Sequence, residues 1–317
     1  MRVLFLAICF FIFKESTAQI REFYSNSVNS TILLCKNEKG QLIPYGTAFI
    51  YYNYLLPEDN ILVTCEHLTY HDTLIALIPA NDSIKKELLK TRTTKINFSS
   101  KTGMQSIEFD GNNFLFTIPL KLNYNFFKHQ YLDLAVIFCT LPSTLDHSSK
   151  SVLLTNVKSL PISVLGTKEQ IYAGQEIAFI GFPYGIGTPI GYYGMQTYSD
   201  LKTNPVIRKG IVSWTSENSP LLLVDGFSYG GNSGSPIFSI PNIEYQGKFI
   251  GMVFGHLTDD FEINDLIIDT TKKTITPNKK NLEINNGLAK CIPAYIISEF
   301  VNDALSKRKN TTTYLIK

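Results

Sequence analysis

The most constraining feature of this sequence is a run of six small residues, Gly231-Asn232-Ser233-Gly234-Ser235-Pro236, which lies between two apolar stretches. Glycine and small polar residues let the backbone turn tightly and leave room for another molecule to approach closely. Such a turn can direct successive backbone N–H groups into one concavity, where a negatively charged oxygen can be held. The same composition is also typical of an ordinary hairpin turn. The run therefore indicates either a plain turn or a serine nucleophile with its oxyanion hole.

A serine hydroxyl is a weak nucleophile at neutral pH, so a catalytic Ser233 needs a base and a group that orients the base. His67 follows the apolar run 61–63, which predicts a buried strand that ends in a short turn. Asp133 opens the apolar segment 134–138, an unusual place for a charge that is not paired. Taken singly, such a histidine is usually structural and such an aspartate usually forms a turn. Their order along the chain, His67, Asp133 and then Ser233, favours a catalytic triad.

In this order and context the three residues resemble those of the trypsin/chymotrypsin-like serine proteases. The segments GTAFIYY (46–52) and LVTCEHL (62–68) look like the strand pair that delivers the base of that family, and LDLAVIF (132–138) looks like the strand of its acid. Residues 174–185, 208–213 and 247–255 resemble strands of its second barrel. The resemblance implies an all-β fold of two packed antiparallel β-barrels, a short C-terminal helix, and an active site in the cleft between the barrels.

The bacterial branches of the family share the most with this motif. Deg/HtrA-like proteases have the asparagine before the serine, and glutamyl endopeptidases share the whole GNSGSP string. In the digestive branch an aspartate at this position pairs with a newly cleaved N-terminal ammonium group and so assembles the oxyanion hole. Asn232 is neutral and cannot form that ion pair, and no IVGG-type sequence precedes the first expected barrel. We therefore expect that the site needs no zymogen cleavage of that kind.

The resemblance also implies roles for the site residues. Ser233 is expected to attack a peptide carbonyl, His67 to move the proton, and Asp133 to orient His67. The backbone N–H groups of Gly231 and Ser233 are expected to form the oxyanion hole.

By the spacing of the family, the resemblance further implies a substrate pocket with Phe227 at its base and with Val253 and Gly255 along its wall. An aromatic floor offers no anion to a Lys or Arg side chain. Val253 stands where glutamyl endopeptidases have a pocket histidine, so preference for glutamate does not transfer, and small or apolar P1 residues are expected. His256 either faces the cleft or belongs to an ordinary loop.

The first 18 residues predict a signal peptide. Arg2 supplies a positive start, residues 3–13 form a short apolar run, and residues 16–18 form a small-residue cleavage site, which places the mature start at Gln19. The alternative is an uncleaved membrane anchor, but the apolar run is only about half as long as a membrane span requires. No later segment is long and apolar enough to cross a bilayer, and we expect a secreted or periplasmic protein.

The remaining chain is expected to divide into two barrels and a tail. Residues 19–150 would form the N-terminal β-barrel with His67 and Asp133, and residues 151–308 the C-terminal β-barrel with Ser233 and a closing helix over 294–305. Residues 309–317 would form the tail. Two stretches exceed a minimal family member. Residues 82–89 are expected to form a short helix, and residues 258–286 are polar and Lys-rich. Each segment is either a lid, an exosite or a solvent-exposed insertion without a role in the reaction.

Composition and cysteine content narrow the function classes further. A chain of 317 residues with 44% hydrophobic content can bury a sizeable core. A net charge of +2 with scattered lysines does not indicate nucleic-acid binding. After loss of the signal peptide the four cysteines left allow three disulfide pairings, or are small buried hydrophobes: Cys35, Cys65, Cys139 and Cys291. No C-x-x-C or His-rich spacing indicates a metal site. We expect no metal or cofactor, and nothing in the sequence indicates an oligomeric state.

Protein or peptide substrates are therefore expected, and two alternatives stay open. A protease-like protein that binds rather than cuts would be expected to have lost a triad member, and none is missing. An esterase could use the same triad, because acyl transfer to water is common to both reactions. Deg-type proteases normally carry a PDZ domain after the barrels, for which the expected terminal helix leaves no room, so peptide recognition is expected to come from the barrels themselves.

Overall fold

The structure is a computed structural model. It describes residues 20–39, 41–51, 60–70, 74–79, 95–100, 103–110, 115–120, 125–139, 144–147, 150–153, 158–160, 162–183, 204–216, 219–241, 247–269 and 274–315. The segment 82–89, which was expected to be a short inserted helix, lies outside these residues. Within them no helix is long and apolar enough to cross a membrane.

The N-terminal half forms a nine-stranded antiparallel sheet in the order β5-β6-β7-β4-β1-β2-β3-β9-β8. The expected strand pair before His67 is present, with Phe49 of β2 opposite Val63 of β3, and β9 pairs with β3 along its other edge. The strands are β1 (Thr31–Glu38), β2 (Gln41–Tyr51), β3 (Asn60–Thr64), β4 (Leu74–Pro79), β5 (Lys95–Ser100), β6 (Gly103–Asp110), β7 (Leu115–Pro119), β8 (Asn125–Lys128) and β9 (Ala135–Cys139).

The C-terminal half forms a closed six-stranded barrel in the order β12-β13-β14-β17-β16-β15. Its strands include the three segments that the sequence singled out. They are β12 (Glu176–Gly181), β13 (Val206–Thr215), β14 (Leu222–Asp225), β15 (Pro236–Ser239), β16 (Phe249–Asp269) and β17 (Thr274–Pro293). Along the chain, the segment that connects the two halves contains a hairpin and two short 3₁₀ turns. The hairpin is formed by β10 (Thr144–His147) and β11 (Lys150–Leu153), and the turns are η2 (Ile162–Val164) and η3 (Lys168–Gln170). The predicted all-β fold is confirmed. Of the two expected barrels, the second is a closed barrel, and the described strands of the first half form a sheet.

One hydrophobic core joins the two halves. The rings of Phe49 in β2 and Phe249 in β16 lie 5.1 Å apart, and Phe249 also packs on Phe238 of β15. A separate cluster, which includes Phe179 and Val212, fills the closed barrel. Since the shared core spans both halves, the faces that meet between them are held by packing.

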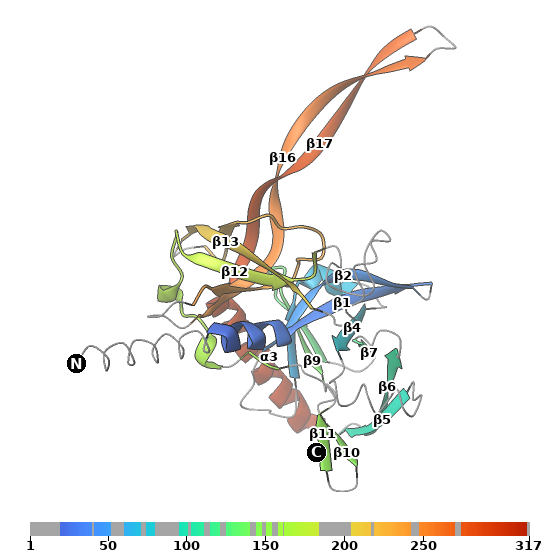
Figure 1. Ribbon diagram of the computed structural model, residues 1–317, viewed down its shortest axis with the longest axis vertical. Helices are drawn as coiled ribbons and strands as arrows, with labels where there is room; N and C mark the ends of the chain where they lie inside the picture. The colour runs from blue at the N-terminus through green and yellow to red at the C-terminus, as the bar shows by residue number, and fades with distance from the viewer. Residues whose placement is uncertain are drawn as a thin grey trace, which may run out of the picture.

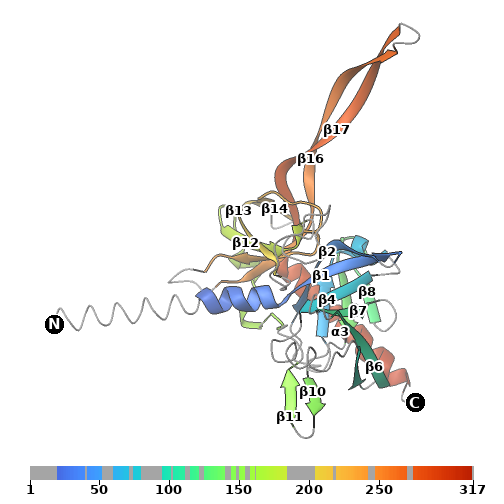
Figure 2. The same cartoon turned by 45° about the vertical axis from the view of Figure 1, so that its right-hand side comes forward.

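Two helices cover this core, and one of them was not predicted. Residues 20–29 are helical and bury Phe23, whose ring meets Phe238 edge-on at 5.5 Å. The apolar spacing of residues 20, 23, 24 and 28 is the helical signal that the sequence contained. Figures 1 and 2 show this helix beside the barrel.

The C-terminal helix is longer than expected. Helix α3 runs over Ala294–Leu315, so it extends beyond the expected end at residue 305 and into residues 309–315 of the expected tail. It packs on the first sheet as well as the second, because the Tyr51 hydroxyl donates to Ser298 Oγ at 2.8 Å and the guanidinium of Arg308 lies over the Phe138 ring at 4.6 Å. The first sheet thus supplies apolar surface along much of the helix.

The excursion at 258–286 is a two-stranded arm. Beyond His256 the strands β16 and β17 continue paired with each other, from Thr258 opposite Asn285 to Asp269 opposite Thr274. Figures 1 and 2 show the arm extending far from the body of the molecule. An isolated two-stranded hairpin is at best marginally stable in water.

Candidate active site

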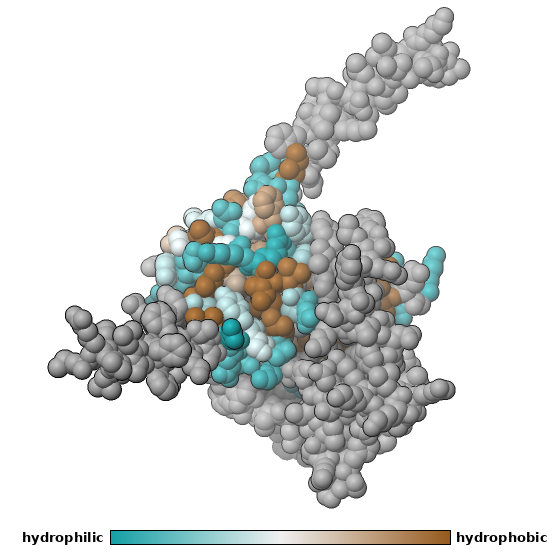
Figure 3. Space-filling view, viewed as in Figure 1, coloured by the Kyte–Doolittle hydropathy of each residue, from teal (hydrophilic) through white to brown (hydrophobic). Residues whose placement is uncertain are grey.

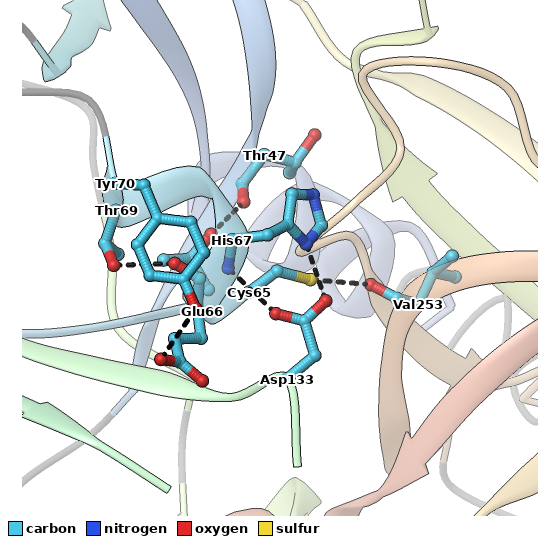
Figure 4. Close-up of polar contacts among 9 residues, drawn as sticks. Thr47, Cys65, Glu66, His67, Thr69, Tyr70, Asp133 and Val253 are labelled. Atoms are coloured by element: carbon cyan, nitrogen blue, oxygen red, sulfur yellow. Dashed lines mark hydrogen bonds and ion pairs between the residues drawn. The ribbon is translucent and has the colours of Figure 1, made fainter.

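His67 and Asp133 are brought together by adjacent strands. His67 lies in the 3₁₀ turn η1 (Glu66–Tyr70) directly after β3, and Asp133 lies two residues before β9, which pairs with β3. The Nδ1 atom of His67 is 2.5 Å from Oδ2 of Asp133, and the backbone N–H of His67 donates to Oδ1 at 2.9 Å. Figure 4 shows the ring and the carboxylate facing one another. The two contacts fix both the position and the orientation of the imidazole.

The environment of Asp133 stabilises its charged form. Burial acts to raise the pKa of this carboxyl, but hydrogen bonds from the His67 ring and from the backbone N–H groups of His67 and Glu66 outweigh it, together with attraction to His67. The pKa of Asp133 therefore lies below the ordinary value for aspartate. An ionised Asp133 accepts the Nδ1–H of His67, which leaves Nε2 as the basic atom of the ring.

The loop with Ser233 is attached to the first sheet through Thr47. The Thr47 N–H donates to the Ser233 carbonyl at 2.8 Å, and its hydroxyl donates to the Gly231 carbonyl at 2.8 Å. The Thr47 carbonyl in turn accepts the hydroxyl of Thr64, at the end of the strand that leads to His67. Sequence reasoning missed Thr47 because its partners in the loop are 184 or more residues away and no local pattern marks them.

The backbone of the Ser233 loop leaves two N–H groups available. Within the described chain, the N–H groups of Asn232, Gly234 and Ser235 all donate to backbone carbonyls, whereas those of Gly231 and Ser233 donate to none. Gly231 and Gly234 have φ values of +93° and +87°, a conformation in which glycine is favoured. These two free donors are the pair that the sequence predicted for an oxyanion hole.

Cys65 lies behind the His67–Asp133 pair and is fully buried. Its thiol donates to the Val253 carbonyl at 3.4 Å, and burial raises the pKa of that thiol well above its ordinary value. The ligand atoms of Cys65, His67 and Asp133 lie within 4.8 Å of one another. His67 and Asp133 are nevertheless closer together than the roughly 3.3 Å that separates two ligands of one tetrahedral zinc ion. In this arrangement they bind each other.

The surroundings of the cysteines fit small buried hydrophobic residues better than disulfide partners. Cys35, Cys65 and Cys291 are buried free thiols. Burial raises the pKa of Cys35 and Cys291 far above the usual range, so their thiolate populations are very small at neutral pH. The backbone of Cys139 belongs to β9, and its side chain lies outside the described part.

The predicted pocket residues occupy different surroundings. Phe227 is half exposed, with its ring stacked on that of Tyr229 at 6.2 Å. Val253 is fully buried, and its backbone binds Gly234 and Ser235 of the nucleophile loop. Gly255 and His256 lie where the arm begins, opposite Lys290 and Ala289 of β17. Figure 3 shows apolar side chains on the described surface of this barrel, below the arm. The role of these residues in substrate binding stays a prediction.

The fold and site define a class of protein. Residues 46–252 match the family model of the trypsin-like peptidase domain, which covers more than half of the chain and includes His67, Asp133 and Ser233. The chain belongs to the trypsin-like peptidase family, and the protein is a peptidase of that family.

The chain is also similar to a solved structure. Among solved structures, the HtrA-type protease AlgW, solved with a decapeptide, is 14% identical to this chain, with a TM-score of 0.44. That alignment covers 90% of this chain and 67% of the other. No curated protein matches the chain.

Proposed function

We propose that this protein is a serine endopeptidase that hydrolyses peptide bonds through His67, Asp133 and Ser233 with an acyl-enzyme intermediate. The observation that carries the proposal is the double contact of Asp133 with His67, through the ring Nδ1 and the backbone N–H. A histidine held in this way is oriented for use of its Nε2, and a structural histidine does not need that restraint.

The proposed reaction uses groups of this chain alone. His67 Nε2 takes the proton of the Ser233 hydroxyl as Oγ attacks the substrate carbonyl, and the Gly231 and Ser233 N–H groups bind the resulting oxyanion. His67 then gives the proton to the leaving amine as the peptide C–N bond breaks. A water molecule attacks the acyl-enzyme with His67 again as the base, which releases the acid and restores Ser233. The described residues form no hydrogen bond between Ser233 Oγ and His67, so the mechanism requires this contact to form with bound substrate.

The direct test is labelling by a fluorophosphonate of the wild type and of Ser233→Ala, followed by profiling on a peptide library. We expect the wild type to be labelled and to cleave peptides, and the variant to lose labelling and to lower kcat by on the order of 10⁴ to 10⁶. An unlabelled wild type would support a protease-like binding protein instead. Labelling with turnover of esters alone would support the esterase. Wild-type turnover in Ser233→Ala would rule out the triad.

The substrate preference proposed here is for small or apolar P1 residues. The half-exposed Phe227 offers an aromatic surface without a charge. The same peptide library tests this proposal, because cleavage mainly after Lys, Arg or Glu would contradict it.

We further propose that a signal peptide of residues 1–18 exports the protein to the periplasm or the medium. The support is the positive start, the short apolar run and the small residues before Gln19. N-terminal sequencing of the exported protein should find Gln19 as the first residue. Retention of residues 1–18 on a membrane fraction would favour the uncleaved anchor.

A further inference from the structure

Asn232, the residue before Ser233, is completely buried, and its side chain has specific partners. In the amide orientation that satisfies its neighbours, Oδ1 accepts the Tyr229 N–H at 3.0 Å and Nη1 of Arg208 at 3.3 Å. The backbone N–H of Asn232 donates to the Tyr229 carbonyl at 3.0 Å. A buried amide oxygen without such donors would be costly, so these contacts restrain the backbone on the N-terminal side of Ser233.

Arg208 is held in place by aromatic rings. It lies on β13, and its guanidinium carbon is 4.7 Å from the centre of the Tyr229 ring and 5.2 Å from that of Phe179. The Tyr229 ring stacks in turn on Phe227. A guanidinium packed on rings loses little mobility when it binds an amide oxygen.

These contacts bear directly on the two free N–H groups. The Gly231 N–H lies between Tyr229 and Asn232 in the chain, and the Ser233 N–H follows Asn232. A rotation of either peptide would redirect a donor, and the Arg208–Asn232 contact opposes that rotation from one side. On the other side, the Thr47 hydroxyl holds the Gly231 carbonyl. The loop is thus clamped by one residue from each half of the molecule.

We propose that Arg208 is a positioning residue that organises the oxyanion hole by binding the side chain of Asn232. This inference rests on the proposed peptidase mechanism. Arg208 touches no reacting atom, and it acts through Asn232 on the Gly231 and Ser233 donors. The guanidinium that orders the loop belongs to Arg208 of the same barrel. The oxyanion hole therefore does not need the N-terminal ammonium group that zymogen cleavage would supply.

The first test is Arg208→Met, which keeps an apolar chain against the rings and removes the donors. We expect kcat on a short peptide, and the rate of fluorophosphonate labelling, to fall by roughly 10- to 100-fold, with KM changed less than about threefold. The matched control is Lys209→Met, the next residue on β13, whose exposed ammonium pairs with Glu176 at 2.7 Å. It should retain wild-type kcat. A loss in KM alone, or equal losses in both variants, would overturn the proposal.

The second test introduces a charge in place of the amide. Asn232→Asp should keep at least about a third of wild-type kcat, because Arg208 can form an ion pair with the new carboxylate. In the double variant Arg208→Met/Asn232→Asp the buried carboxylate has lost that partner, and kcat should fall at least tenfold below the product of the two single effects. Losses that simply multiply would contradict a direct Arg208–Asn232 interaction.

Two further measurements separate the possible failures. Thermal unfolding of each variant identifies loss of folding, and Arg208→Lys, which keeps the charge and loses the planar fork, should give a kcat between those of Met and wild type if the variant is folded. An active wild type with an unaffected Arg208→Met overturns the role of Arg208 alone. An inactive, unlabelled wild type overturns the proposed peptidase mechanism instead.

Discussion

The backbone N–H of Thr47 donates a 2.8 Å hydrogen bond to the carbonyl oxygen of Ser233, which joins the N-terminal sheet to the nucleophile loop of the barrel. The Thr47 hydroxyl adds two contacts, since it donates to the Gly231 carbonyl at 2.8 Å and accepts the Phe182 N–H at 3.2 Å. His67 follows β3, the strand next to β2 in the same sheet. Thr47, whose side chain is fully buried, therefore contributes to the relative placement of base and nucleophile.

Removal of the Thr47 hydroxyl should weaken both the fold and the reaction. In Thr47→Val the shape is kept, but the Gly231 carbonyl and the Phe182 N–H lose a buried partner, at a cost of about 1–3 kcal/mol in the free energy of unfolding. We expect kcat to fall together with the melting temperature. Thr47→Ser keeps the hydroxyl and should stay near wild type in kcat. Equal behaviour of the two variants in denaturant unfolding and peptide assays would show that the hydroxyl is unimportant.

Asp133→Asn should lower kcat by on the order of 10⁴ with little change in KM. The amide keeps the size of the carboxylate, but it cannot stabilise the imidazolium and permits the wrong His67 tautomer. Steady-state kinetics on a peptide substrate measure the effect. Asp303→Asn, which removes an exposed carboxylate paired with Lys307 on α3, is the charge-matched control and should leave kcat unchanged. A kcat for Asp133→Asn within tenfold of wild type would contradict the assigned role.

The lowered pKa of Asp133 predicts a pH dependence of stability. A carboxyl whose pKa is lower in the folded than in the unfolded protein stabilises the fold above the unfolded pKa, about 4 for aspartate, and this contribution disappears as pH falls through the folded value. The difference in melting temperature between wild type and Asp133→Asn should therefore be largest at pH 5 and above, about one unit over that pKa, and should shrink in more acid solution. A difference that grows on acidification would have the wrong sign.

Two glycines with the same backbone angle should respond very differently to alanine. Gly234 and Gly174 both have φ of +87°, but a Cβ on Gly234 would lie 1.8 Å from the Thr47 carbonyl oxygen, whereas a Cβ on Gly174 would meet nothing within 4 Å. Gly174→Ala should cost about 1–2 kcal/mol from backbone strain alone. Gly234→Ala adds displacement of the nucleophile loop, so it should cost more in denaturant unfolding and should abolish peptide cleavage. Similar unfolding energies would mean that the loop adjusts freely.

The arm should be dispensable for the chemistry. Asp259 pairs with Ile284, so residues 260–283 can be replaced by an Asn-Gly turn that preserves the register at the base. The arm beyond this pair is bonded strand to strand, and Asn285, which donates to the Ser228 carbonyl at 2.6 Å, is retained. We expect kcat/KM on a short peptide to stay within about threefold of wild type. A large loss on short peptides would show that the arm supports the site, and a loss confined to protein substrates would identify it as an exosite.

The local sequence pattern predicts a strand or helix where the apolar residues that mark it lie within that one strand or helix. The strands around His67 and Asp133 were recognisable because a continuous apolar run is what a strand buried on both faces requires. The spacing of apolar residues predicts the closing helix but not its end. Helix α3 continues past residue 305 over polar residues, and among them Arg308 packs on the Phe138 ring through a contact that no local rule reveals. The helix at 20–29 carries its own apolar spacing directly after the predicted signal peptide.

Residue type and spacing alone predict the β-rich class, the order His67, Asp133 and Ser233, and the small residues that allow the loop around Ser233 to turn. The groups that hold that loop become visible only once the chain is folded. Thr47 and Arg208 reach it from distant strands, and Asn232 is satisfied by a stacked guanidinium. The N–H groups of Gly231 and Ser233 stay free while those of Asn232, Gly234 and Ser235 are paired. Hydrogen bonds and ring contacts between distant segments form only when packing brings the segments together, so no local pattern encodes them.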